Sequence, residues 1–191
     1  TADHRLMLEN PEDVVYGLYI LMKALDVKKG YIGIEVNKLD AIEAIEKEVK
    51  KYENIEVSRL EIKYPQGAEK QLIYACTGGR EVPSGGLPMD VGVVVNNVET
   101  AAQIARTIKT GMPLVERITT VTGSCITEPK NLVTRVGTLV SEIIEQCGGF
   151  KEGKTVGKII IGGPMMGIAQ YTINIPINKG ASGILCLDKQ E

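Results

Sequence analysis

The stretch that most constrains this chain is residues 91–100, where a run of valines leads through an asparagine pair into a helix-like pattern. Four valines in five residues predict a buried strand, and the apolar spacing after Asn97 predicts a helix. In open α/β sheets, ligands bind beyond the carboxyl ends of strands, where helix N-termini offer N–H groups. We therefore expect Asn96, Asn97 and Thr100 to face a nucleotide-like ligand. The alternative is plain N-capping, because Asn is among the best N-cap residues.

The first 110 residues alternate between helix and strand patterns. Helical spacing predicts helices over residues 11–26, 41–49, 68–77 and 96–110, and β-branched runs predict strands over 31–36, 55–63 and 91–95. The second helix can begin after either Asn37 or Asp40. Strands separated by helices of ~10–15 residues predict a parallel sheet with both faces covered. The expected fold is a three-layer α/β sandwich.

A boundary falls at Gly111-Met112-Pro113, and a different order of elements follows it. Residues 117–122 and 132–136 predict a hairpin, and Thr138 can cap a helix that ends at Gly148-Gly149. Residues 158–161 and 183–187 predict two more strands. Two strands, a helix and two strands is the order of a small α+β β-grasp module. The predicted domains are therefore residues 1–112 and 113–191.

Composition excludes several kinds of protein. The net charge is −2 and the basic residues are scattered, so nothing indicates binding to nucleic acid or to an anionic membrane. No apolar run reaches the ~18 residues of a transmembrane helix. The four cysteines are far apart and form no C-x-x-C pair, so we interpret them as reduced, mostly buried thiols of a cytosolic protein, with no metal site.

Acid–base chemistry has no clear carrier in this sequence. His4 is the only histidine, and no Ser or Cys is placed to form a triad with it. We therefore predict no catalytic side chain, which favours a protein whose chemistry belongs to a bound cofactor.

Three glycine-containing stretches are further candidates for function. Gly67 precedes a helix, and Glu69 in its first turn can accept from a ribose hydroxyl or a flavin N–H, although an acidic helix start is also common by itself. In the loop of residues 78–88, Arg80 could meet a phosphate. Residues 162–167 are expected to form a tight turn with packed methionines, or else a turn whose methionines face a partner.

Several of these stretches together resemble the C subunit of the Rnf ion-translocating electron-transport complex. The resemblance covers essentially the whole chain and rests on residues 1–9, 63–72, 80–88, 97–98 and 162–167. More distantly, residues 95–100 resemble the FMN- and NADH-binding subunit of respiratory complex I. Both families combine a flavin-binding α/β domain with a soluble-ligand-binding β-grasp domain.

The resemblance implies an NADH-oxidising, FMN-dependent subunit that passes electrons to 4Fe-4S clusters at the cytoplasmic face of the membrane. By motif match, Asn96, Asn97 and Thr100 would line the FMN, while Gly67 and Glu69 would lie near the flavin or the nicotinamide. The other subunits and NADH would be its partners, and membrane contact would come only through those subunits. The family's glycine-rich flavin loop and cluster cysteines are absent, so we expect an internal fragment that is inactive alone.

Two alternatives remain open. Cobalamin reductases of bacterial microcompartments share the architecture. A non-catalytic docking or ligand-binding module is the alternative from another class, and the Met165-Met166 turn would support it.

Overall fold

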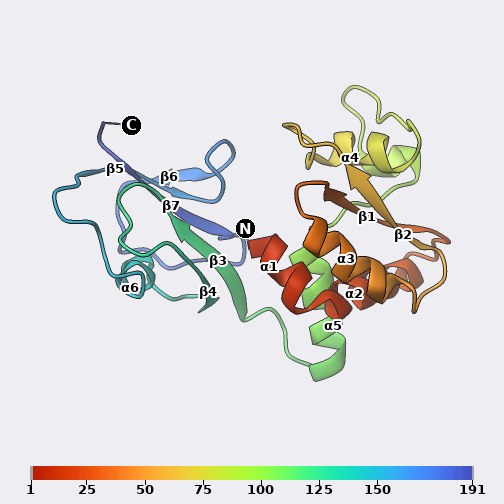
Figure 1. Cartoon of the computed structure of the whole chain (residues 1–191), viewed down its shortest axis with the longest axis horizontal. Coiled ribbons are helices and arrows are strands. Elements are labelled where there is room, and N and C mark those ends of the chain that lie inside the picture. The colour runs from red at the N-terminus through yellow and green to blue at the C-terminus, as the bar shows by residue number, and fades with distance from the viewer. Residues whose placement is uncertain (1, 191) are drawn as a thin grey trace. The chain divides into compact units, whose positions relative to one another are not determined.

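The computed structural model describes residues 2–190, which form two compact units, each with its own sheet (Figure 1). One unit comprises Asp3–Gly111, and the other comprises Ala2 and the described residues from Met112 onward. Within the described residues, no helix is both long enough and apolar enough to cross a lipid bilayer.

The first unit contains five α-helices, a short 3-10 helix and two strands among its described residues. In chain order these are α1 (Ala2–Glu9), α2 (Pro11–Ala24), β1 (Gly30–Glu35), α3 (Leu39–Val49), β2 (Ile55–Leu60), α4 (Glu69–Cys76), η1 (Pro88–Val91) and α5 (Val98–Thr110). The four predicted helices are confirmed, with ends within two residues of the expected positions. Both strands before residue 64 are also confirmed, although β2 ends at Leu60. The separate helix α1 was not predicted.

Helices cover both faces of the parallel pair formed by β1 and β2. In the ladder, Gly30 lies opposite Ile55 and Glu35 lies opposite Leu60. A Cβ atom added at Gly30 would lie 2.7 Å from Met22 Sδ of α2, whereas one added at Gly33 would lie 2.6 Å from Leu72 Cδ1 of α4. Residues three apart on a strand face opposite sides, so α2 lies on one face and α4 on the other. The three-layer prediction is therefore confirmed.

The predicted strand over residues 91–95 is wrong. Val91 ends η1, Gly92 has a left-handed φ of 67°, and residues 93–97 belong to no helix or strand. Val93 N–H donates to the carbonyl oxygen of Pro88 at 3.1 Å. Valine favours strands because it fits a pleated surface beside a partner. Within residues 2–190 the β1–β2 sheet has only those two strands, so the valine run has no partner there.

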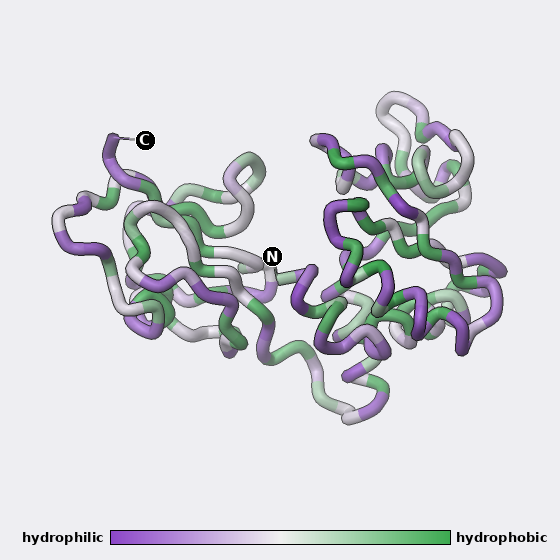
Figure 2. Tube along the Cα trace, in the orientation of Figure 1, coloured by the Kyte–Doolittle hydropathy of each residue, from purple (hydrophilic) through white to green (hydrophobic). Residues whose placement is uncertain are grey.

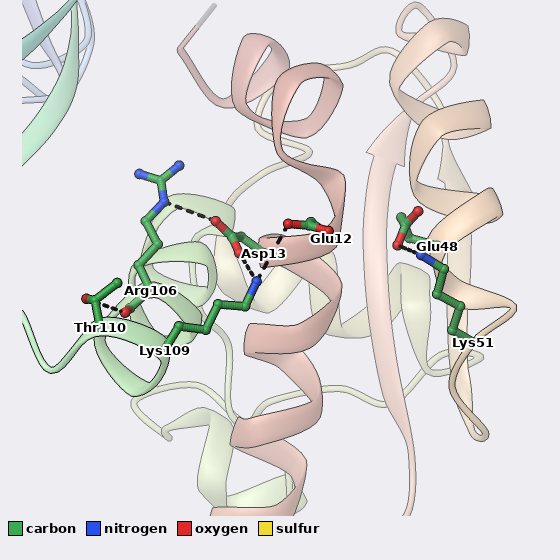
Figure 3. A network of polar contacts seen from close by, with 7 residues as sticks. All are labelled: Glu12, Asp13, Glu48, Lys51, Arg106, Lys109 and Thr110. Carbon is green, nitrogen blue, oxygen red and sulfur yellow. Dashed lines mark hydrogen bonds and ion pairs between the residues drawn. The ribbon is translucent and has the colours of Figure 1, made fainter.

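The body of α5 is held against α2 by a close approach and by charge. A Cβ atom at Gly17 would lie 1.8 Å from the carbonyl oxygen of Ala101, so the two helices meet where one has no side chain. Asp13, which is 8% exposed, accepts from Arg106 Nε at 3.2 Å and from Lys109 Nζ at 2.6 Å (Figure 3). The hydrogen bond to Asp13 raises the pKa of Lys109. These contacts fix the helix that follows Asn97.

The described residues of the second unit form a five-stranded mixed sheet and one α-helix. Its elements are β3 (Glu116–Thr122), β4 (Lys130–Arg135), α6 (Val140–Glu145), β5 (Val156–Ile161), β6 (Ile168–Gln170) and β7 (Gly183–Asp188), and the strand order is β4-β3-β7-β5-β6. β3 pairs antiparallel with β4 and parallel with β7, while β5 pairs antiparallel with β7 and β6. The predicted hairpin, helix and two later strands are confirmed. The short edge strand β6 was not predicted.

The ends of α6 differ in how well the sequence predicted them. Leu139 occupies the N-cap position and makes no side-chain cap, so the prediction that Thr138 caps this helix is wrong. The backbone N–H of Thr138 instead donates to the carbonyl oxygen of Arg135 at 3.1 Å. The chain leaves the helix through Gly148 and Gly149, whose φ angles are 74° and 73°, as predicted.

One continuous core fills the second unit. Its members are buried apolar side chains of the sheet, the helix and the connecting segments: Val121, Cys125, Ile126, Val140, Ile143, Ile144, Cys147, Ile177, Ala181, Ile184 and Cys186. Thr119 and Thr134, both buried, share a hydrogen bond of 2.8 Å across β3 and β4. The carbonyl oxygens of Ala181, at 3.0 Å from Thr119 Oγ1, and of Arg117, at 3.3 Å from Thr134 Oγ1, are further acceptors, so the two buried hydroxyls have hydrogen-bond partners.

The turn between β5 and β6 is tight, as predicted, but its methionines are not packed. Gly167 N–H donates to the carbonyl oxygen of Gly163 at 2.7 Å, which closes the turn. Met165 is 72% exposed and Met166 is 85% exposed. The expectation of methionine packing is therefore wrong, because the turn carries these side chains away from the core.

Candidate functional site

Asn97 is the N-cap of α5. Its Oδ1 accepts from the backbone N–H of Glu99 at 2.8 Å, and its Nδ2 donates to Asp3 Oδ2 of α1 at 2.9 Å. The capping interpretation is thus confirmed. Both polar atoms of the amide are engaged, so Asn97 also ties the start of α5 to α1. Contact between Asn97 and a flavin stays a prediction.

Asn96 and Thr100 flank this cap and are both exposed. Asn96 ends the irregular segment before the helix, and Thr100 is the third helical residue. Since the N–H groups of a first helical turn have no intrahelical acceptor, the two side chains lie beside backbone donors. The start of α5 therefore presents an amide, a hydroxyl and N–H groups to whatever approaches it.

Gly67 and Glu69 lie at the start of α4, after the carboxyl end of β2. Ala68 is the N-cap residue and has no side-chain acceptor, so the first turn of α4 receives no side-chain cap. A Cβ atom at Gly67 would meet nothing within 4 Å. Gly67 and Glu69 are exposed. A planar ring or a hydroxyl could approach this backbone closely, with the Glu69 carboxylate as an acceptor.

The segment of residues 77–97 joins the two candidate groups, and hydrogen bonds give it shape. Arg80 Nη1 donates to the carbonyl oxygen of Val91 at 2.8 Å, and Asp90 Oδ2 accepts from Leu87 N–H at 2.8 Å. The Thr77 hydroxyl donates to the carbonyl oxygen of Ile73 at 2.6 Å and anchors the segment to α4. The guanidinium of Arg80 thus braces the loop, and the suggestion that it meets a phosphate gains no support.

Two residues near the candidate site escaped the sequence analysis. Asp3 holds Asn97 through a contact between residues 94 positions apart, which no sequence spacing indicates. Tyr64 lies three residues before Gly67 and is 73% exposed. An aromatic residue in a turn just before a glycine was the available signal, because an exposed ring offers a stacking surface.

The remaining reactive side chains lie elsewhere. All four cysteines are free, and Cys125, Cys147 and Cys186 are buried in the second unit. Burial raises the pKa of Cys186 to about 11 and also raises the pKa of Cys147 and of Cys76. The described part of the chain contains no group of three His, Cys, Asp or Glu residues that could hold a metal ion. Cys125, Cys147 and Cys186 belong to the apolar core of the second unit, and Cys76 is half-buried on α4.

A hollow of about 290 Å³ lies on the second unit, lined by Gly153, Lys154, Thr155, Asp188, Lys189 and Gln190. Lys154 Nζ lies 2.8 Å from Asp188 Oδ2 in its wall. All five candidate residues belong to the first unit, so this hollow is not their site.

Comparison with known proteins identifies two family models in this chain. The model described as the Nuo51 FMN-binding domain matches residues 1–106, and the SLBB domain matches residues 118–169. The structure is also similar to the crystal structure of an NAD+-reducing NiFe-hydrogenase in the air-oxidised state, with a TM-score of 0.76 at 18% identity over 99% of this chain and 38% of that one. At that identity the likeness shows the fold alone.

Curated relatives are similar along the whole chain. The C subunit of the Na+-translocating ferredoxin:NAD+ oxidoreductase complex of Acetobacterium woodii is 55% identical, and its proton-translocating counterpart from Clostridium ljungdahlii is 54% identical. The C subunit of the ion-translocating oxidoreductase complex of Rhodobacter capsulatus is 40% identical. Each match covers 100% of this chain, but 42%, 41% and 36% of the respective relatives.

The resemblance to the C subunit of the Rnf complex is therefore confirmed at the level of similarity. The FMN-binding match covers more than half of the sequence and includes every candidate residue. The chain belongs to the Nuo51 FMN-binding domain family.

Proposed function

We propose that this chain is part of the FMN-dependent, NADH-oxidising subunit of an ion-translocating ferredoxin:NAD+ oxidoreductase complex. One observation carries the proposal. The family match over residues 1–106 coincides with the unit in which Gly67, Glu69, Asn96 and Thr100 stand exposed at two helix starts. The names of the relatives support the kind of complex.

The exposed groups suit recognition of a flavin and a nicotinamide. Glu69 would accept a hydrogen bond from a hydroxyl or an N–H, while the bare backbone at Gly67 would allow a flat ring to approach. Asn96 and Thr100 would hydrogen-bond the flavin, with Asn97 setting the position of the α5 start through Glu99 and Asp3. The exposed ring of Tyr64 would stack on a ligand. When bound, FMN supplies the hydride and electron chemistry, and this chain supplies contacts and orientation.

The two units would divide the work. Residues 1–112 form the FMN- and NADH-binding-like domain, and residues 113–191 form the β-grasp domain. The 4Fe-4S clusters would lie elsewhere in the parent protein, and the other subunits would hold this one at the cytoplasmic face of the membrane. Because the chain spans about two fifths of its first relatives, we propose that full FMN affinity and NADH turnover require more of that polypeptide.

Flavin titration of the full-length subunit tests the site. Asn96→Ala and Glu69→Gln should each raise the Kd for FMN about tenfold, which corresponds to ~1.4 kcal/mol of binding free energy. Quenching of flavin fluorescence on binding is the measurement. Asn174→Ala is the matched control, because Asn174 is an exposed asparagine of the second unit and should leave the Kd unchanged.

Two results would count against the proposal. Wild-type affinity in both Asn96→Ala and Glu69→Gln would remove these residues from the site. Saturable micromolar binding of FMN by the 191-residue chain alone would contradict the need for further polypeptide.

A docking role for the second unit is the other candidate function. The exposure of Met165 and Met166 favours it over the cobalamin reductase alternative, for which the structure offers no observation. The two roles are compatible, since they use different units.

A further inference from the structure

The turn and edge strand that follow β5 expose more apolar side chain than their surroundings. Within seven positions, Met165 is 72% exposed, Met166 is 85%, Ile168 is 70% and Tyr171 is 96%. We define residues 164–171 as the β6 edge. Figure 2 shows the turn between β5 and β6 largely in white and green. Neighbouring exposed apolar side chains in a soluble domain are characteristic of a contact surface.

Charge is also absent from this region. No Asp, Glu, Lys or Arg occurs from Ile159 to Asn178, although charged residues make up 24% of the chain. A stretch of 20 residues would carry about five charges at that frequency. This stretch itself therefore offers a partner no charge to pair with, and an uncharged partner is the complementary one.

The backbone of β6 is available on one side. Within the described residues β6 pairs with β5 alone and forms one edge of the sheet. Gly162 N–H donates to the carbonyl oxygen of Gly183 in β7. Along a strand, the backbone N–H and C=O groups of successive residues point alternately to the two neighbouring strands. The backbone groups of Ile160 therefore point toward β7, and those of Ile159 and Ile161 point toward β6. Ile168 and Gln170 then pair with β5, and the N–H and C=O of Ala169 point outward.

The opposite edge of the same sheet is built differently. β4 begins with Lys130 and ends with Arg135, and Lys130 is bonded to the carbonyl oxygen of Gln146 at 3.0 Å. Charged residues on an edge strand, lysine especially, discourage pairing with another chain. β6, with the sequence Ile-Ala-Gln, carries no such protection. One edge is guarded and the other is open.

We propose that the β6 edge docks an extended, uncharged segment of another protein subunit, which pairs with Ala169 and covers Met165, Met166 and Ile168. The inference rests on the proposed place in a multi-subunit complex. Lipid is the less suitable occupant, because hydrocarbon would leave the outward N–H and C=O of Ala169 without partners, whereas a strand satisfies both.

The test uses the full-length subunit in the assembled complex, captured through an affinity tag on a different subunit. Met165→Asp with Met166→Asp places two charges in the contact, and Ala169→Pro removes the outward N–H at an edge position that tolerates proline. Each variant should lower the recovered subunit at least tenfold. Val133→Asp on β4 is the matched control, since Val133 is 68% exposed on the guarded edge, and recovery should not change.

Hydrogen–deuterium exchange supplies a second readout that does not depend on a variant. The Ala169 amide should exchange at least tenfold more slowly in the complex than in the free subunit. Equal exchange in the two states, or wild-type recovery of both edge variants, would overturn the proposal.

Two further measurements give the other occupants their own outcomes. Binding of the free chain to phosphatidylglycerol–phosphatidylethanolamine vesicles that is lost in the methionine double variant would overturn the proposal in favour of a membrane. A dimer in light scattering that Ala169→Pro abolishes would overturn it in favour of a second copy.

The flavin test remains separate. Flavin content and NADH-dependent reduction of a soluble acceptor should be unchanged in the edge variants. Loss of flavin binding in every form would contradict the proposed function, and retained flavin with unchanged assembly would contradict the docking inference alone.

Discussion

The two units of this protein are stabilised in different ways. The second unit surrounds one apolar core with a five-stranded sheet and a helix, and three buried cysteines belong to that core. The first unit has a two-stranded sheet within the described residues, and its helix α2 packs on both α5 and α3. There, α2 is held to α5 by the close approach of Gly17 to the Ala101 backbone. The hydrogen bonds that Asp13 accepts from two cationic side chains of α5 also hold the two helices together.

This difference has a consequence for function. The body of α5 is fixed by α2, while its start is fixed by Asn97 and Asp3. Asn96, just before the cap, and Thr100, in the first turn, can then remain exposed without contributing to the core. The α5 start is thus ordered by α2 and by the cap residue Asn97, while Asn96 and Thr100 beside it stay exposed.

Gly17→Ala should produce the largest effect. The new methyl group would lie 1.8 Å from the Ala101 carbonyl oxygen, so α2 and α5 must separate. We expect the first unit to lose about 3 kcal/mol of unfolding free energy, while exchange-protected amides of the second unit keep their protection. Gly67→Ala is the control, because nothing lies within 4 Å of its added Cβ. Equal loss of protection in both units would remove the contrast between them.

Cys186→Ser tests the apolar core of the second unit. Cys186 is 0% exposed, and a hydroxyl there would be buried among apolar groups. The cost should be about 2 kcal/mol by chemical denaturation. Cys76→Ser, at a half-buried position in the first unit, should cost less.

The high pKa of Cys186, about 11, also predicts slow reaction with thiol reagents near neutral pH. Rapid labelling of the native protein would contradict this.

Asp13→Asn tests the polar contact between α2 and α5. The substitution removes the negative charge that Arg106 and Lys109 share (Figure 3), so the first unit should lose about 1.5 kcal/mol. Glu12→Gln is the matched control. Glu12 is 68% exposed and lies 3.7 Å from Lys109, so its loss should be close to zero by thermal unfolding. Equal effects of the two variants would show that the buried carboxylate has no special role.

The two neighbouring asparagines should separate stability from binding. Asn97→Ala removes the cap of α5 and the bond to Asp3, so the first unit should lose about 1 kcal/mol. Asn96→Ala should leave the melting temperature within error of wild type and weaken FMN binding. Thermal unfolding and flavin titration of the same two proteins are the measurements. The reverse result would assign the ligand contact to the cap residue.

The smallest effect should come from Asp188 in the second unit. The hydrogen bond from Lys154 holds the pKa of Asp188 below its ordinary value of 3.8. A lowered carboxyl pKa contributes stability that is fully present above 3.8 and is lost as pH falls through the native value. The difference in melting temperature between wild type and Asp188→Asn should therefore be present at about pH 6 and shrink toward about pH 2. A difference that grows on acidification would contradict the assignment.

Local patterns predicted most elements of both units, because the spacing of apolar residues within a segment indicates whether it forms a helix or a strand. The helix α2 and the strands β1, β5 and β7 are examples. The valine run at residues 91–95 failed because a strand needs a partner, and pairing is a property of the fold. The β6 strand was missed because three residues are too few to show an alternation of apolar and polar side chains.

The sequence alone determined that this chain combines an α/β unit with a β-grasp-like unit, and its motifs indicated the family. Tertiary structure decided what individual residues do. It placed Asp3 against Asn97 across 94 positions, turned Arg80 toward Val91, and left Met165 and Met166 uncovered. Periodicity and motif spacing record each segment's own preferences, whereas burial and hydrogen-bond partners depend on contacts between distant segments that only the folded chain brings together.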